Sequence, residues 1–259
     1  MVAVTELVQD HDLISGGERL KARLALPATK GAYEARHALV FCHGLPSQDP
    51  VLRNDRTYDL LIGRIARDLG WTALGLSLRG CAGSQGNFSV EAWMTDLDAA
   101  VEHLRAECGA TGVWLAGAGT GGSMAIAAGG HNPDVRGVAA LAARADFDDW
   151  LAEPERLIQH CRDINVIHDD TFPSDRDEWL GGFEKRRPVD AARLLGDRPL
   201  LLIHGEYDRQ VPIADAERIA EAHGSASLRI IPNGDHRLRH DPRAVALLMG
   251  WLDRQRAKL

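Results

Sequence analysis

The stretch VWLAGAGTGGSMAIAAGG, Val113 to Gly130, decides the fold of this 259-residue chain. Its apolar start indicates a buried strand, GAGTGG indicates a tight turn, and the alanine-rich remainder indicates a helix. Parallel α/β sheets are built from strands that turn into helices in this way. A turn of this shape often presents a catalytic nucleophile, but the central position of this one is Gly119. The sequence therefore raises the question of what this turn does without a reactive side chain.

Strand-like and helix-like segments alternate on both sides of this turn. The expected strands cover residues 4–8, 20–26, 37–44, 71–78, 113–116, 135–141, 200–204 and 228–231. The expected helices cover residues 58–69, 90–108, 121–128, 213–223 and 242–255. This alternation predicts an α/β fold with a mostly parallel, doubly wound sheet.

The alternation breaks between residues 143 and 197, which indicate short helices and loops. We expect residues 143–197 to form a small helical cap insertion, with residues 1–142 and 198–259 forming the core. The insertion is expected over the carboxyl edge of the sheet, where open α/β sheets bind their ligands. Four aromatic side chains in it either line an apolar pocket or form its own small core. They are Trp150, Phe172, Trp179 and Phe183.

Composition and charge narrow the functional classes. The net charge is −7, and no cluster of Lys and Arg stands out, which argues against binding to nucleic acid. No apolar run approaches the roughly 18 residues that span a membrane, and the first residues lack a secretion-signal pattern. The four cysteines are scattered and are expected to be reduced thiols. We therefore expect a cytoplasmic protein without membrane or nucleic-acid partners.

Four short motifs follow successive predicted strands of the parallel sheet. They are His43-Gly44-Leu45-Pro46, GAGTGG (Gly117–Gly122), GEYDRQVP (Gly205–Pro212) and IPNGDH (Ile231–His236). Because the carboxyl ends of parallel strands meet at one edge, these motifs are expected to lie together and to form a ligand site.

In the order of these motifs the chain resembles the α/β-hydrolase family over nearly its full length. It is most similar to small bacterial members grouped with serine aminopeptidases and esterases. In that family a G-x-S-x-G nucleophile lies between a strand and a helix, followed along the chain by an acid and a histidine. The resemblance implies Asp208 as the acid and His236 as the base. It also implies that the backbone amides of Leu45 and Thr120 bind the oxyanion.

The chain departs from the family pattern at the nucleophile itself. When the turn is aligned on its flanking glycines, Gly119 occupies the position of the serine. A glycine has no side chain to attack a carbonyl, so no acyl-enzyme forms there. A strained strand-to-helix turn suits glycine better than serine, so loss of selection for catalysis favours this residue. An engineered serine-to-glycine replacement would give the same sequence.

Three other side chains are alternative nucleophiles. Shifting the register by one residue brings Thr120 to the turn, although a β-branched residue fits the strained conformation poorly. Ser123 is expected to pack inside the following helix. Cys81 lies on a neighbouring strand-end loop, where it either approaches the site or packs as a buried thiol.

Further polar residues near the motifs have mainly structural interpretations. His43 is expected to pack beneath its own loop, and Arg79 either holds the loop after its strand or contacts an anionic substrate. His236 and His240 have the spacing of two metal ligands on a helix, but Asp241-Pro242 interrupts any helix there. The sequence therefore predicts no metal and no cofactor.

Three functional hypotheses remain from the sequence. The first is a hydrolase of a small acyl substrate (an ester, thioester or amide), with His236 as base, Asp208 orienting it, and water or Thr120 as nucleophile. The second is a non-catalytic protein of this fold that binds a small ligand or a partner. The third is a lyase step that needs only a base and an oxyanion hole. The substrate and the oligomeric state are not specified by the sequence.

Overall fold

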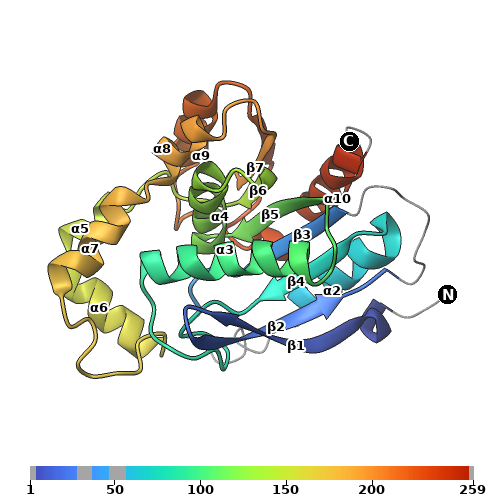
Figure 1. Ribbon diagram of the computed structural model, residues 1–259. Coiled ribbons are helices and arrows are strands. Elements are labelled where there is room, and N and C mark those ends of the chain that lie inside the picture. Colours follow the sequence, from blue (N-terminus) through green and yellow to red (C-terminus); the bar gives the residue numbers. More distant parts are fainter. Residues whose placement is uncertain (1–3, 28–36, 47–56, 257–259) are drawn as a thin grey trace.

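The computed structural model describes residues 4–27, 37–46 and 57–256, and over these residues eight strands form one sheet (Figure 1). The strands are β1 (Val8–Ser15), β2 (Glu18–Ala25), β3 (His37–Cys42), β4 (Thr72–Leu76), β5 (Gly112–Ala118), β6 (Val135–Leu141), β7 (Leu200–Gly205) and β8 (Ser227–Ile231). Their order is β1-β2-β4-β3-β5-β6-β7-β8. The strands β3 to β8 are parallel, and β2 joins them antiparallel to β4. The predicted mostly parallel sheet is therefore confirmed.

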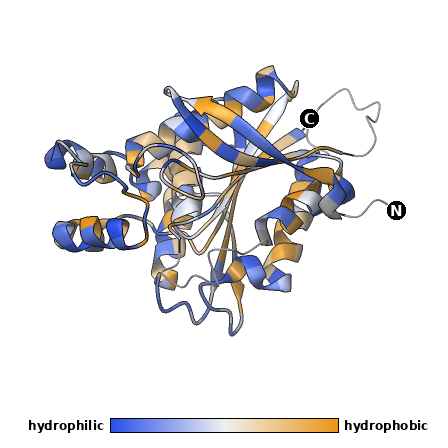
Figure 2. Ribbon diagram, turned by 90° about the horizontal axis from the view of Figure 1, so that it is seen from below, coloured by the Kyte–Doolittle hydropathy of each residue, from blue (hydrophilic) through white to orange (hydrophobic). Residues whose placement is uncertain are grey.

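Helices cover both faces of the sheet, so the predicted double winding is also confirmed. One face carries α2 (Thr57–Arg64), its π-helical continuation η2 (Ile65–Leu69), and α10 (Pro242–Arg256). The other face carries α3 (Val90–Ala106), α4 (Thr120–His131), α8 (Pro188–Leu194) and α9 (Ile213–His223). Two buried apolar clusters fill the space between sheet and helices, and Figure 2 shows the strands between the two groups of helices.

The predicted first strand, residues 4–8, is wrong. Val4–Leu7 form a short 3-10 helix, η1, and β1 follows it as Val8–Ser15. This edge strand pairs with β2 through a turn at Gly16 and Gly17, both with positive φ. Because β1 has a neighbour on one side only and is largely exposed, its sequence VQDHDLIS is polar and lacks the apolar pattern of a buried strand.

The chain between β6 and β7 forms four helices. They are α5 (Asp148–Ala152), α6 (Pro154–Asp163), α7 (Arg176–Lys185) and α8. Helices α5 to α7 project to the side of the sheet domain, whereas α8 packs against α4 and α9 (Figure 1). The division into a core and a cap over residues 143–197 stays a prediction.

The aromatic side chains of this segment form a core rather than a pocket lining. Trp179 and Phe183 are buried, and their rings contact each other and Phe88 of the loop before α3. The Trp179 indole donates a 2.9 Å hydrogen bond to the Phe88 carbonyl. Trp150 and Phe172 are partly buried against the same cluster. These contacts attach α7 to the sheet domain.

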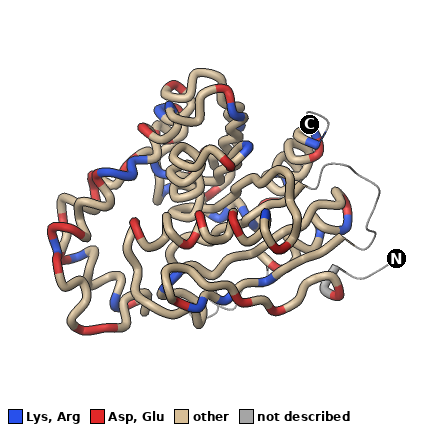
Figure 3. The backbone as a smooth tube through the Cα atoms, viewed as in Figure 1, with Lys and Arg blue, Asp and Glu red and all other residues tan. Residues whose placement is uncertain are grey.

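Charges and thiols fit the expectations from composition. Acidic and basic residues are interspersed along the described chain (Figure 3). All four cysteines are free, and burial raises the pKa of Cys161 to about 12. Within the described ranges no helix combines the length and the apolar composition needed to cross a membrane.

Two histidines join the edge strand to helix α3. The Nε2 atoms of His11 in β1 and His103 in α3 lie 2.7 Å apart, so one ring donates a hydrogen bond and the other accepts it. Burial and the neighbouring His11 lower the pKa of His103 by more than Glu107 raises it. If both rings take up an extra proton, the hydrogen bond breaks and two like charges lie in contact. The pair therefore stabilises the fold in its neutral form.

We expect this pair to make stability depend on pH. Folding lowers the pKa of His103 below its ordinary value of about 6.5. The stability that the pair gives to the folded protein is therefore complete above about pH 6.5. It disappears as the pH falls through the lower pKa of the folded protein. Melting temperatures across this range should therefore drop less in His103→Gln than in wild type. Equal drops in the two proteins would contradict the assignment.

Candidate active site

The turn between β5 and α4 has the backbone of a nucleophile elbow. Strand β5 ends at Ala118, α4 begins at Thr120, and Gly119 joins them with φ 56° and ψ −129°. Residues other than glycine rarely adopt these backbone angles. The Gly119 amide donates to the Leu141 carbonyl of β6 at 2.8 Å, and its carbonyl accepts the Gly122 amide at 3.0 Å. Hydrogen bonds therefore hold both sides of the turn.

The neighbouring glycines allow α4 to approach the sheet closely. A Cβ at Gly121 would collide with the His43 carbonyl of the loop after β3. A Cβ at Gly117 would collide with the Gly121 backbone. Packing around the elbow therefore requires glycine at positions 117 and 121, whatever the role of Gly119.

The imidazole of His236 faces the missing side chain of Gly119. A Cβ built on Gly119 would lie 3.2 Å from His236 Nε2 and 3.7 Å from its Cε1. Beyond the atoms of residues 118–120 themselves, no other described atom lies within 4 Å of that position. A side chain at residue 119 would therefore point at the ring nitrogen that acts as a base in a catalytic triad.

The other nitrogen of this imidazole is held by Asp208. His236 Nδ1 donates to Asp208 Oδ2 at 2.8 Å, and the Gln210 and Val211 amides donate to Oδ1 at 2.8 and 2.9 Å. Burial raises the pKa of Asp208, but these hydrogen bonds outweigh it and hold the pKa below its usual value. The carboxylate only accepts, so Nδ1 carries the proton and Nε2 keeps a lone pair directed at Gly119.

The Thr120 amide lies at the elbow, and the loop that carries Leu45 lies against it, where an oxyanion hole is expected. The Thr120 amide is the first of α4 and has no acceptor within its own helix. Gly44, next to Leu45, lies against the elbow, since a Cβ on it would be 3.3 Å from the Thr120 nitrogen. His43 fixes this loop: its Nε2 accepts the Leu78 amide at 3.0 Å, and its Nδ1 donates to the Gly44 carbonyl at 2.7 Å.

Comparison with known proteins finds similarity in structure alone. No protein-family model matches the chain, and no curated protein matches it. Est1E from Butyrivibrio proteoclasticus, solved with ferulic acid bound, superposes with a TM-score of 0.70 at 17% identity, covering 96% of this chain and 98% of its own. An esterase domain of a Rhodothermus marinus protein gives 0.69 at 23% identity, covering 95% and 98%. The acylaminoacyl peptidase of Pyrococcus horikoshii gives 0.67 at 19% identity, covering 95% of this chain and 41% of its own.

The chain has the α/β-hydrolase fold. The neighbours that share this fold include esterases and peptidases, while identities of this size show the fold alone. The turn at Gly119, the turn at Asp208 and the loop of His236 follow the carboxyl ends of the parallel strands β5, β7 and β8, as the motif order predicts.

The α/β-hydrolase elbow of this chain contains Gly119 and not Thr120. Thr120 is already the first residue of α4, and its side chain is almost fully buried. Ser123 is buried one turn later, where its Oγ accepts the Arg144 amide at 2.9 Å. Cys81 is buried, and burial raises the pKa of its thiol far above the usual value, which keeps it protonated. The geometry therefore argues against all three as the nucleophile.

Arg79 has a structural environment in this fold. Its guanidinium pairs at 2.7 Å with Asp96 of α3, whose side chain is completely buried, and it donates to Ser15 of β1. These contacts tie the loop after β4 to two other elements.

Among the described residues, no three His, Cys, Asp or Glu side chains converge as metal ligands.

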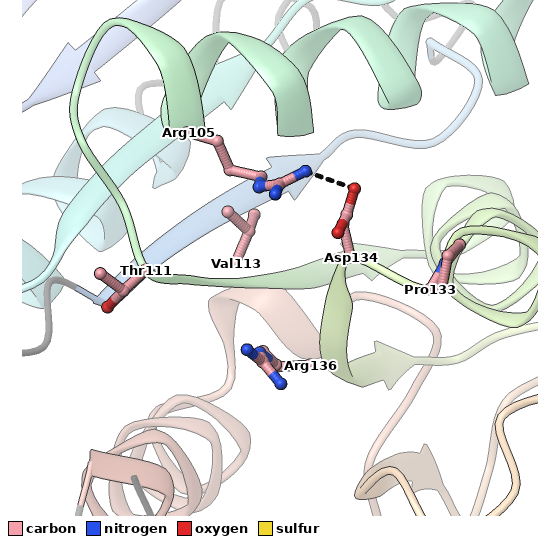
Figure 4. A pocket seen from close by; sticks show the side chains of 6 residues that line it. All are labelled: Arg105, Thr111, Val113, Pro133, Asp134 and Arg136. Carbon is pink, nitrogen blue, oxygen red and sulfur yellow. Dashed lines mark hydrogen bonds and ion pairs between the residues drawn. The ribbon is translucent and has the colours of Figure 1, made fainter.

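A small hollow elsewhere in the molecule is unrelated to this chemistry. It lies at the amino end of β5, near Val113, the second residue of the strand (Figure 4), whereas Gly119 follows the carboxyl end. Its Arg105 pairs with Asp134, and Arg136 points from another side (Figure 4). Its lining includes arginine, aspartate and threonine side chains but no histidine.

Proposed function

We propose that this protein hydrolyses a small acyl substrate (an ester, thioester or amide) with water as the nucleophile. The observation that carries this proposal is the direction of His236. Its Nε2 faces the side-chain position of Gly119 at 3.2 Å, while Asp208 holds Nδ1 at 2.8 Å. A water molecule in place of the absent side chain would donate a hydrogen bond to Nε2, which is the geometry that a general base requires.

The proposed reaction is a single displacement. Nε2 of His236 takes a proton from the water as the water oxygen attacks the acyl carbon. The carbonyl oxygen gains negative charge, which the Leu45 and Thr120 amides stabilise. The imidazolium then gives its proton to the leaving group as the bond to the acyl carbon breaks. The products are a carboxylic acid and an alcohol, thiol or amine, and His236 returns to its neutral form.

The expected turnover is slow. General base catalysis contributes roughly 10²–10⁴-fold. Serine proteases that lose one member of the triad keep a residual acceleration of roughly 10³–10⁴ over water. Both magnitudes support a measurable rate of hydrolysis that is well below the rate of an enzyme with a serine nucleophile. The fold shared with esterases and peptidases supports acyl substrates as the class.

A non-catalytic binding protein is the second candidate. The observation that favours it is the backbone of Gly119, whose φ of 56° and ψ of −129° suit glycine better than any other residue. A chain no longer selected for catalysis relieves strain by placing glycine there. This candidate keeps the site as a pocket for a small ligand or a partner, and it predicts no hydrolysis that depends on His236.

We expect a fluorophosphonate probe to leave the protein unlabelled. These probes attach to an activated serine or threonine hydroxyl, whereas Thr120 is almost fully buried at the start of α4 and Ser123 Oγ accepts the Arg144 amide. Intact-protein mass spectrometry after incubation measures any added mass. Gly119→Ser serves as the positive control. Labelling of wild type at Thr120 would replace the water mechanism with a covalent one.

Residues 143–197 are proposed to select the substrate. The segment begins beside the elbow helix, because the Arg144 amide donates to Ser123 Oγ of α4 at 2.9 Å. The Arg144 guanidinium pairs with Asp149 at 2.8 Å and lies 4.8 Å from the centre of the Trp150 ring. These contacts hold the first helix of the segment close to the first turn of α4.

A further inference from the structure

A second histidine lies beneath the acid turn. His204 is the penultimate residue of β7, and its side chain is 1% exposed. Its Nε2 lies 3.0 Å from the Val211 carbonyl oxygen and 3.6 Å from Asp208 Oδ2. Its Nδ1 is buried and has no hydrogen-bond partner among the described residues.

These contacts define the tautomer of His204. A carbonyl oxygen only accepts hydrogen bonds, so Nε2 carries the proton and donates it to Val211. The same N–H lies close to Asp208 Oδ2, beyond hydrogen-bond length but near enough for its dipole to favour the carboxylate charge. Nδ1 is then a bare nitrogen without a partner.

The backbone of Val211 connects His204 to the catalytic pair. Its carbonyl accepts from His204, and its amide donates to Asp208 Oδ1 at 2.9 Å. Asp208 Oδ2 in turn accepts from His236 Nδ1. A strand in the interior of the sheet is therefore linked through the backbone of one residue to the carboxylate that orients the base.

We propose that His204 is a positioning residue for Asp208 and, through it, for His236. Leaving a polar atom buried without a partner is unfavourable, and the neighbouring positions Leu202 and Ile203 are apolar. The contact with Val211 and Asp208 gives this histidine a role that an apolar residue of β7 would lack. The proposal rests on the proposed function of His236 as the base, because a fixed Nδ1–H is what keeps Nε2 free to accept a proton.

Two matched variants test this role. His204→Gln keeps an N–H donor at nearly the position of Nε2, whereas the shorter side chain of His204→Asn does not reach Val211. Nitrogen-15 shifts of the His236 ring distinguish a protonated nitrogen from a bare one and require no turnover. We expect His236 to carry its proton on Nδ1 in wild type and in His204→Gln. In His204→Asn both tautomers should appear.

Kinetics give a second readout for the same pair. If wild type hydrolyses p-nitrophenyl acetate, His204→Asn should lower kcat roughly 10- to 100-fold with little change in KM, and His204→Gln should restore most of it. Absence of hydrolysis in wild type counts against the proposed function and leaves the tautomer measurement intact.

Two results would overturn the role of His204. One is a folded His204→Asn in which His236 keeps a single tautomer with the proton on Nδ1. The other is wild type in which His204 itself carries its proton on Nδ1. The wild-type measurement decides the question if both variants fail to fold, since a proton on Nε2 of His204 is the tautomer that the contact with Val211 requires.

Discussion

Gly119→Ser is expected to raise esterase activity by roughly 10²-fold or more, because a serine hydroxyl would meet an already oriented base. The Cβ of the new side chain lies 3.2 Å from His236 Nε2, so the imidazole must move by a few tenths of an ångström. The ring is the end of a flexible side chain that is 23% exposed, and it has room to adjust. The positive φ of residue 119 costs a non-glycine residue about 1–3 kcal/mol, so the melting temperature should fall.

Gly119→Ala is the matched control for this gain. It introduces the same Cβ and the same backbone strain without a hydroxyl. Initial rates with p-nitrophenyl acetate should rise in the serine variant and fall in the alanine variant, because the methyl group occupies the place of the attacking water. A folded Gly119→Ser with no gain over Gly119→Ala would mean that the oxyanion amides or His236 are not aligned for catalysis.

Asp208→Asn in the Gly119→Ser background should lower kcat by roughly 10⁴-fold, the effect of the same change in a serine protease. The side chain of Asp208 is fully buried, and its carboxylate accepts from His236 Nδ1. An asparagine amide offers an N–H in that direction, which favours the tautomer with the proton on Nε2. In that tautomer the imidazole is unable to take a proton from the serine.

Asp235→Asn is the control for the loss of a negative charge. Asp235 precedes His236, is exposed, and accepts a hydrogen bond from the Arg237 amide rather than from the imidazole. Steady-state kinetics of both variants separate orientation of His236 from a general effect of charge. Similar, small losses in the two variants would show that the hydrogen bond from His236 Nδ1 to Asp208 does not control the base.

Buried strands were predictable from the sequence because strands with neighbours on both sides are apolar along most of their length. The expected strand at residues 135–141 coincides with β6, which lies between two parallel neighbours and is apolar along almost its full length. The edge strand β1 was missed because its composition is polar. It is a strand because it pairs with β2. Pairing across a turn depends on tertiary contacts that a local pattern does not show.

For the candidate site, the partners Asp208 and His236 were predictable from the sequence, whereas the geometry around Gly119 was not. The order of the motifs along the chain predicted that Asp208 and His236 form a pair, and in the structure their side chains are in hydrogen-bond contact. The direction of Gly119 toward His236 depends on backbone angles that no motif specifies. His204 was missed although it had a signal: a histidine in an otherwise apolar strand, four residues before the acid.

The most direct measurement is the initial rate of p-nitrophenyl acetate hydrolysis by wild type and by His236→Ala. His160→Gln is the control, because it removes a partly exposed imidazole of α6 and so reports the background of surface histidines. If His236 activates water opposite Gly119, hydrolysis should persist in wild type and His160→Gln and disappear in His236→Ala. Equal rates in all three proteins would contradict catalysis by His236 and favour a binding protein.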